Sequence, residues 1–233
     1  MHDTKRQARI AGLWYLLLAV TAPVSLVYVP GKLFDTTNAA VTAANIRASS
    51  DLLRMGIGFE LFHQAIEVFL VLALYALFKP VDKPLARQLA LFGLIPIPIM
   101  FANAINEVGA LLIAANPPYL QTFAQAQQDA AIQFLIRLHS GGIQIAAVFW
   151  GLWLIPMARL IFRSRFIPAF IGVPVLGAGL AYLYNAFTTL VVPFDSPTMD
   201  TLTVVLQAGE LAIVLWLLIV GARSLNTVSA SEN

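Results

Sequence analysis

Six apolar stretches, separated by short polar ones, run along the chain. Each is about as long as the 20 residues that an α-helix needs to cross the hydrocarbon core of a bilayer. Turn-forming residues such as Pro30-Gly31 and Asn116-Pro117-Pro118 separate them. The pattern predicts an all-α fold, an integral membrane six-helix transmembrane bundle, and a single multi-pass domain over residues 1–233. We expect the spans at approximately 10–29, 53–78, 89–115, 132–160, 167–192 and 202–221.

Two of the polar stretches are long enough to hold structure of their own. Residues 36–51 are polar and rich in alanine, and they predict a short helix on the outer face. Residues 119–131 contain four glutamines, and we expect them to extend the fourth span outward. Prolines interrupt several spans, and we interpret them as packing kinks, which a bundle tolerates where neighbours satisfy the freed carbonyl groups: Pro96, Pro98, Pro156 and Pro174.

Composition excludes a water-soluble domain. The chain is 59% hydrophobic and only 11% charged, whereas soluble proteins carry about 25% charged residues. It has no cysteine, which excludes disulfides and thiolate metal sites. The formal net charge is +2, and the basic residues lie in short runs between apolar spans. We therefore expect the lipid bilayer as a partner and no nucleic acid.

Lysine and arginine fall mostly on one side of the predicted membrane. The amino-terminal tail, the loops after the second and fourth spans, and the end of the chain hold Lys5, Arg6, Arg9, Lys79, Lys83, Arg87, Arg159, Arg163, Arg165 and Arg223. The other side holds only Lys32, Arg47, Arg54 and Arg137. Because cytoplasmic loops carry the excess of basic residues, both termini are predicted to be cytoplasmic.

The two kinds of acidic residue are distributed differently along the chain. All seven aspartates, Asp195 among them, fall in predicted loops or tails, but four of the five glutamates fall inside predicted spans. At about 1.5 Å of rise per residue, polar groups of five spans lie roughly 10–15 Å from the outer ends. These groups are Glu60, His63, Glu107, His139, Asn185 and Glu210.

Helical spacing places several of these groups on shared faces. Glu60, His63 and Glu67 are spaced i, i+3, i+7, which is one stripe of one face. A glutamate that faced lipid would cost about 2.5–3.5 kcal/mol on insertion scales, so the faces must turn inward. We therefore predict a polar ligand pocket in the outer leaflet, formed by Glu60, His63, Asn103, Glu107, Arg137, His139, Asn185 and Glu210. A secondary set of polar residues within the spans comprises Glu67, Asn106, Gln144 and Gln207.

Three functions are compatible with this pocket. The first is binding or transfer of a small ligand from the outer side, in which Glu and His side chains change protonation and Arg137 anchors an anionic group. The second is a membrane-embedded enzyme that uses zinc or iron, with ligands drawn from His63, His139, Glu60, Glu107 and Glu210. The third is a structural or accessory protein whose polar core sets helix packing. The sequence assigns no catalytic residue, and it leaves enzymatic activity and the cofactor open.

Several short motifs, in order along the chain, resemble a bacterial membrane-protein family, domain of unknown function 4386. They are Arg9-Ile10-Ala11-Gly12-Leu13, Leu138-His139-Ser140-Gly141-Gly142, Phe166-Ile167-Pro168-Ala169-Phe170 and Gly209-Glu210-Leu211. The resemblance implies a multi-pass helical protein of the bacterial inner membrane with no assigned activity. It also points to positions Glu60, His139, Ser140 and Glu210, and Ser140 joins the predicted pocket on this ground. One position departs from the resemblance, because Asn185 stands after Tyr184 where we expect an acid.

Overall fold

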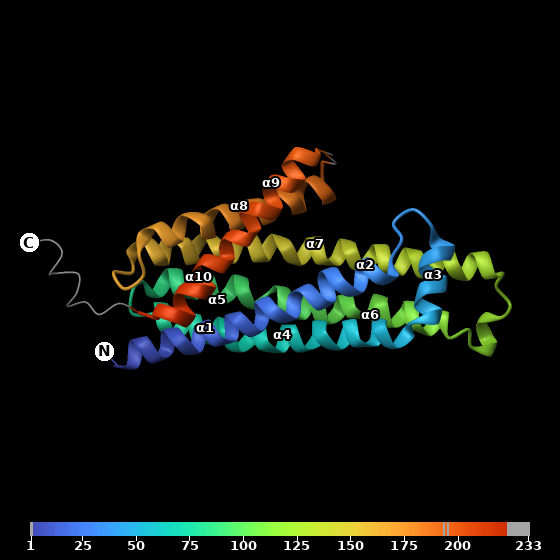
Figure 1. Cartoon of the computed structure of the whole chain (residues 1–233), viewed down its shortest axis with the longest axis horizontal. Helices are drawn as coiled ribbons and strands as arrows, with labels where there is room; N and C mark the ends of the chain where they lie inside the picture. Colours follow the sequence, from blue (N-terminus) through green and yellow to red (C-terminus); the bar gives the residue numbers. More distant parts are fainter. Residues whose placement is uncertain (1, 193, 195, 223–233) are drawn as a thin grey trace, which may run out of the picture. The chain divides into compact units, whose positions relative to one another are not determined.

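The computed structural model describes residues 2–192, 194 and 196–222. All regular elements in that part of the chain are helical (Figure 1), which confirms the all-α prediction. Six of its helices are long and apolar enough to cross a membrane, as predicted: Thr4–Leu33, Ser50–Phe78, Lys83–Ala114, Gln125–Arg163, Ala169–Leu190 and Pro197–Val220. Arg223, counted above among the basic residues of one membrane side, and Asp195, counted among the aspartates in loops, lie outside the described residues.

The first span changes helix type along its length. It joins α1 (His2–Pro23), the π-helical η1 (Val24–Tyr28) and α2 (Val29–Leu33). Pro23 and Pro30 lack a backbone N–H and cannot make the regular bond to the residue four positions earlier. The wider π turn lies between these two prolines, where such local adjustments are expected.

The short helix predicted for residues 36–51 is present as α3 (Ala39–Ala48). Its amino end is capped by Asn38, whose Oδ1 accepts hydrogen bonds from the amides of Ala40 and Val41. The next helix, α4 (Ser50–Phe78), is the second span and carries the Glu60, His63, Glu67 stripe.

The third span is broken into α5 (Lys83–Leu94) and α6 (Pro96–Ala114). α5 begins earlier than expected because Asp82 caps it, accepting a hydrogen bond from the amide of Leu85 at 3.0 Å. α7 (Gln125–Arg163) continues without a break through Pro156. Its start at Gln125 confirms the outward extension of the fourth span, while η2 (Pro118–Leu120) forms a separate 3-10 turn.

The last two spans contain short irregular segments. η3 (Ala169–Ile171) leads into α8 (Gly172–Leu190), and α9 (Pro197–Gln207) lies beside α8 (Figure 1). The final span then passes through the 3-10 segment η4 (Ala208–Glu210), α10 (Leu211–Leu215) and the π-helical η5 (Trp216–Val220). Gly209 permits a close approach to α8, since a Cβ there would lie 2.6 Å from the carbonyl oxygen of Pro174.

Contacts divide the chain into two compact units. Unit 1 takes in the described residues up to Ala19, Ile66–Ile97 and those from Gln144 onward, and unit 2 takes in Val20–Ala65 and Pro98–Ile143. Each unit has its own apolar core. Leu70, Leu74, Leu154 and Leu217 are buried in the first core. Val29, Ile46, Leu53, Ile132 and Ile136 are buried in the second.

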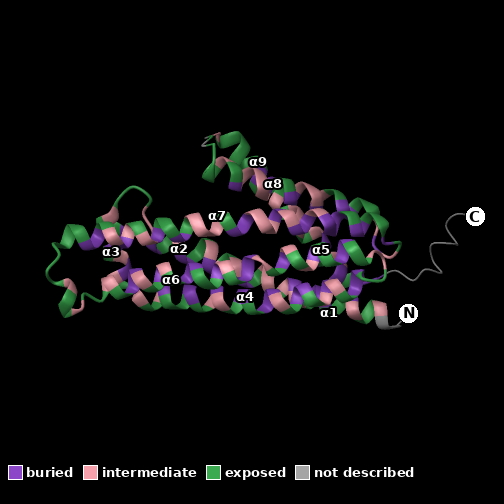
Figure 2. Cartoon of the chain, turned by 180° about the vertical axis from the view of Figure 1, so that it is seen from behind, coloured by how far each residue is buried: buried purple, intermediate pink, exposed green. Residues whose placement is uncertain are grey.

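Many apolar side chains face outward rather than into a core. The exposed residues of α9, green in Figure 2, include Leu202, Val204 and Val205. Within Pro197–Val220, only 22% of the most apolar stretch of 18 residues is buried. An apolar surface of this extent is expected where helices contact lipid rather than water, so the chain has the character of a multi-pass membrane protein.

Candidate functional site

Three helices of unit 2 bring two carboxylates to one imidazole. Glu60 comes from α4, Glu107 from α6 and His139 from α7, and all three are at most 4% exposed. The Nε2 atom of His139 lies 3.0 Å from Oε2 of Glu60. Its Nδ1 atom lies 3.8 Å from Oε1 of Glu107. The imidazole therefore stands between two acids, with one ring nitrogen toward each.

The second oxygen of each carboxylate has no hydrogen-bond partner among the described residues. These atoms are Oε1 of Glu60 and Oε2 of Glu107, and both are buried. Leaving a buried polar atom unsatisfied costs about 1–3 kcal/mol, and more for a charged group. The four salt bridges in the described part of the chain bring no lysine or arginine to either acid. With both acids ionised, the cluster would therefore have an excess of negative charge, and it has more acceptor atoms than donors.

Asn103 holds the backbone beside His139. Its Nδ2 donates a hydrogen bond to the carbonyl oxygen of His139 at 2.9 Å, which joins α6 to α7. Asn106 supports it by donating from Nδ2 to Oδ1 of Asn103 at 3.1 Å. Gly142 leaves room for the Asn103 side chain, because a Cβ at that position would lie 2.1 Å from Oδ1 of Asn103. The two asparagines therefore act as positioning residues.

His63 has a different partner from the one expected in a two-histidine metal set. Its Nδ1 lies 3.0 Å from the hydroxyl oxygen of Thr21, which comes from the first span. His63 is buried within unit 2. It does not belong to the Glu60, Glu107 and His139 group, whose ligand atoms lie close enough together to hold a metal ion. Threonine hydroxyls commonly bond across membrane helices, but no sequence pattern identified Thr21 as the partner.

Arg137 and Ser140 form hydrogen bonds outside the Glu60, Glu107 and His139 cluster. Both residues are exposed. The guanidinium of Arg137 donates a hydrogen bond to the carbonyl oxygen of Thr36, in the loop before α3. The hydroxyl of Ser140 donates to the carbonyl oxygen of Ile136, one turn earlier in α7. Neither hydrogen bond involves His139. Although Arg137 and Ser140 lie close to His139 in the sequence of α7, their side chains therefore do not bond to it.

Glu210 belongs to unit 1 and forms hydrogen bonds with two tyrosines. The hydroxyl of Tyr15 donates to its Oε1 at 2.5 Å, and the hydroxyl of Tyr182 donates to its Oε2 at 3.4 Å. The prediction that Glu210 lies with His139 rested on depth alone, which fixes the height of a side chain but not its rotation about the helix. Sequence reasoning missed both tyrosines, and their positions inside apolar spans were the available signal.

The remaining predicted residues also belong to unit 1. Asn185, Gln144 and Gln207 are half-buried, and Glu67 is fully buried. Oε1 of Gln144 and Oε2 of Glu67 are buried without a hydrogen-bond partner among the described residues. None of the four belongs to the Glu60, Glu107 and His139 group.

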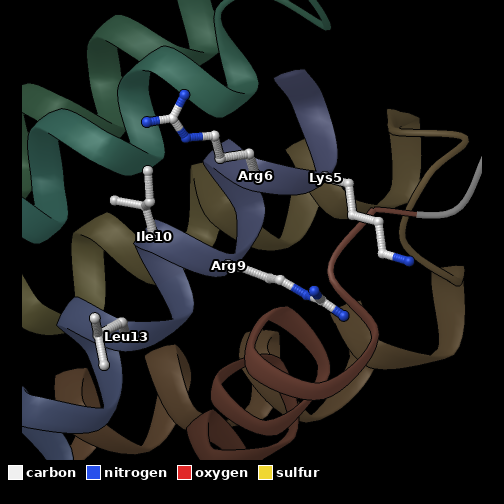
Figure 3. Close-up of a pocket in the computed structure, with 5 residues that line it drawn as sticks. All are labelled: Lys5, Arg6, Arg9, Ile10 and Leu13. Carbon is white, nitrogen blue, oxygen red and sulfur yellow. The ribbon is translucent and has the colours of Figure 1, made fainter. Parts of the chain in front are cut away.

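A pocket of different character lies on the first turns of α1 in unit 1. Its lining, drawn in Figure 3, is basic and aliphatic and contains neither an acid nor a histidine: Lys5, Arg6, Arg9, Ile10 and Leu13. Exposed basic side chains above aliphatic ones are typical of helix ends at the cytoplasmic membrane surface. The lining residues belong to unit 1, and none of them is a member of the Glu60, Glu107 and His139 group.

Glu60, Glu107 and His139 form a group that could hold a metal ion. One ligand atom from each residue lies within 4.8 Å of the others. Imidazole nitrogen and carboxylate oxygen suit zinc and iron, and the absence of thiolates argues against metals that need soft ligands. Among the described residues, this is the one group of three or more histidine, aspartate or glutamate side chains whose ligand atoms lie this close together.

Comparisons with known proteins identify the family but no activity. The search of curated proteins found no match, and neither did the search of solved structures. The sequence matches the family described as a domain of unknown function (DUF4386) over residues 10–221, which include all six spans except residues 4–9 at the start of the first. The chain therefore belongs to the DUF4386 family of membrane-type helical proteins.

Proposed function

We propose that this membrane protein binds a divalent metal ion through Glu60, Glu107 and His139. The observation that supports the proposal is that each of the two carboxylates beside the His139 imidazole has a second, buried oxygen without a hydrogen-bond partner among the described residues. A doubly charged cation would balance the two carboxylates and supply the missing partner for their oxygens. Burial without such a cation would leave several kcal/mol of desolvation cost uncompensated for each ion.

The distances fit a small ion after modest side-chain rotation. Zinc bonds to nitrogen and oxygen of about 2.0–2.2 Å place tetrahedral ligands roughly 3.4 Å apart. The three candidate ligand atoms already lie within 4.8 Å of one another. Rotations about the terminal torsions of Glu60 and Glu107 would close the difference without moving the helices. One histidine and two glutamates replace the two-histidine set that the sequence suggested.

Three protein ligands would leave a coordination position for a small molecule. When bound in such a site, zinc or iron acts as a Lewis acid that polarises a carbonyl group or activates a water. Glu60 and Glu107 would hold the ion, and Asn103 would fix the α7 backbone at His139. In the orientation predicted from the basic residues, the ligand would enter from the outer side.

A second candidate function is proton-linked binding of a small ligand without a metal. It is supported by the contact of Nε2 of His139 with Glu60 and of Nδ1 with Glu107, at 3.0 and 3.8 Å. An imidazole in this position can accept a proton at one nitrogen and release one at the other. This function does not need Arg137, whose guanidinium bonds to the carbonyl oxygen of Thr36.

Calorimetric titration of the purified protein with zinc, iron(II) and magnesium separates the two functions. We expect zinc or iron(II) to bind in an equimolar ratio to the chain, and magnesium to bind much more weakly because it prefers oxygen ligands. Glu60→Gln, Glu107→Gln and His139→Gln should each lower the affinity at least about tenfold, since each removes a ligand while roughly preserving side-chain size.

Asp51→Asn is the matched control, because it removes one carboxylate from the exposed start of α4. It should leave the titration unchanged. Undiminished zinc and iron binding by all three cluster variants would overturn the proposal. The second candidate would be supported instead if the wild-type protein binds no metal and takes up protons, and if His139→Gln no longer takes them up.

A further inference from the structure

A second polar cluster lies inside unit 1 and uses other residues. Tyr15 of α1 and Tyr182 of α8 donate their hydroxyl hydrogens to the two oxygens of Glu210 in η4. Glu67 of α4 is 2% exposed and interacts electrostatically with Glu210. It also interacts electrostatically with both tyrosines, which places it in the same cluster.

The two acids of this cluster have unequal surroundings. Glu210 accepts two hydrogen bonds, one at each carboxylate oxygen, which stabilise its ionised form. Glu67 has a buried Oε2 without a hydrogen-bond partner among the described residues. The four salt bridges of the described chain bring no lysine or arginine to either carboxylate. Two buried negative charges in one cluster would have no ion-pair partner among the described lysines and arginines.

We infer that Glu67 and Glu210 together hold one monovalent cation, which is a proton bound to Glu67 or a sodium ion bound within the cluster. A proton on Glu67 converts the acid that lacks donors into a neutral group and leaves a single charge on Glu210. That charge is the one that the hydroxyls of Tyr15 and Tyr182 already solvate. The charge asymmetry favours the proton, and a sodium ion would satisfy the same balance.

The packing of the backbone around Glu210 supports an ordered site for this cluster. The last span changes from α to 3-10 geometry at Ala208–Glu210, where Gly209 brings its backbone against Pro174. The regular α-helical bonding pattern therefore changes at the residue that carries the carboxylate. Among the described residues, the titratable groups that interact with the pair are Tyr15 and Tyr182, and their aromatic neighbours Trp150 and Trp153 are neutral.

Infrared spectroscopy of the full-length protein in neutral buffer tests this inference. If the cation is a proton, the wild type shows the carbonyl band of a buried, protonated carboxylic acid, and Glu67→Gln removes it. Glu210→Gln keeps a protonated Glu67, so the band persists. Tyr15→Phe keeps the band and deprives Glu210 of one donor, and it provides a readout should a glutamine variant fail to fold.

If the cation is sodium, that band is absent and sodium raises the melting temperature, whereas a large organic cation does not. Glu67→Gln should then abolish the sodium dependence. Asp200→Asn, at an exposed acid of α9, should behave as the wild type in both measurements. The inference is overturned if Glu67→Gln changes neither the band nor the cation dependence. Metal titration of unit 2 is a separate readout, so failure here leaves the proposed function standing.

Discussion

Gly142 controls the space in which Asn103 reaches the backbone of His139. A Cβ at Gly142 would lie 2.1 Å from Oδ1 and 2.4 Å from Cγ of Asn103, distances that real side chains do not adopt. The adjacent Gly141 has no atom within 4 Å of such a Cβ. Two neighbouring glycines of one helix thus have opposite packing requirements, and only one of them concerns the site.

Gly142→Ala should therefore weaken both the fold and the metal affinity. Overpacking costs about 1–3 kcal/mol, and displacement of Asn103 removes its hydrogen bond to the carbonyl oxygen of His139. Gly141→Ala is the matched control and should be neutral or stabilising by up to about 1 kcal/mol, because alanine favours the helix. Thermal unfolding in detergent and zinc titration measure the two effects. Equal behaviour of the two variants would contradict the role of Asn103.

Asp35 gives the loop before α3 a defined dependence on pH. Its Oδ1 accepts hydrogen bonds from the hydroxyl and amide of Thr37 and from the amide of Asn38. The hydroxyl bond from Thr37, more than any other contact, lowers the pKa of Asp35 below its ordinary value. A lowered pKa in the folded state means that the ionised form stabilises the loop. That contribution is present above the ordinary pKa and is lost as the pH falls through the lowered pKa.

The protection of the amides of Thr37 and Asn38 against hydrogen exchange, taken relative to the intrinsic chemical rate at each pH, should accordingly fall in acid. Asp35→Asn should show lower protection at neutral pH and little further change in protection on acidification. Asp51→Asn, in the exposed first turn of α4, serves as a control and should leave the loop as in the wild type. Protection that is independent of pH in the wild type would contradict this account of Asp35.

At the scale of elements, the first and last spans approach closely at Gly12. A Cβ at Gly12 would lie 2.6 Å from the backbone nitrogen of Leu218 in η5, so the two backbones are in contact there. Small residues at such crossings let membrane helices pack where lipid offers no hydrophobic driving force. Gly58 of α4, in contrast, is exposed, and a Cβ added there would have no atom within 4 Å.

Gly12→Ala should lower the stability of the protein, because a backbone atom cannot move aside as a flexible side chain can. We expect a loss of at least about 1–3 kcal/mol, measured by unfolding in mixed micelles. Gly58→Ala introduces the same methyl group into open space and should leave stability unchanged or slightly raised. A Gly12→Ala protein as stable as the wild type would show that α1 and η5 do not pack in this way.

The elements that could be predicted were those set by local pattern. Span number, the helix at Ala39–Ala48 and the extension of α7 follow from hydrophobic length and capping residues. The π turn at Val24–Tyr28 and the 3-10 turn at Ala208–Glu210 were not predicted. They depend on contacts with other helices, such as that between Gly209 and Pro174, and a single helix does not encode these contacts.

The same limit applies to the site. The faces of α4, α6 and α7 indicated Glu60, Glu107 and His139, because burying an unpaired acid in lipid is too costly for any other orientation. Partner choice was beyond the sequence. His63 bonds to Thr21, and Glu210 bonds to Tyr15, since the rotation of each helix is fixed by apolar packing along its whole length. Depth along the membrane normal therefore grouped side chains that the structure assigns to two units.

At the scale of the whole molecule, the distribution of lysine and arginine predicts how the protein is oriented in the membrane. The chain has no cysteine, so single cysteines report the position of any loop without background. Gln121→Cys places a thiol in the exposed turn after η2, and Lys83→Cys places one at the exposed first residue of α5. In intact cells an impermeant maleimide should label Gln121→Cys, and it should label Lys83→Cys only after the membrane is opened. The reverse pattern would place both termini outside.

Metal binding should also depend on pH, with a sign fixed by the ligands. Protons compete with a metal for both carboxylates and for the imidazole, so the affinity must fall as the solution is acidified. Binding should release protons, and the measured heat should vary with the ionisation enthalpy of the buffer. A zinc affinity that does not change with pH would indicate ligands other than Glu60, Glu107 and His139.

X-ray absorption spectroscopy at the metal edge tests the central claim most directly. The zinc-loaded protein should show nitrogen and oxygen neighbours at about 2.0–2.2 Å, with the outer-shell signal of one imidazole. His139→Gln should remove that signal, while His63→Gln should retain it. A spectrum with sulfur neighbours, with two imidazoles, or with an imidazole that survives His139→Gln would contradict a metal site built from Glu60, Glu107 and His139.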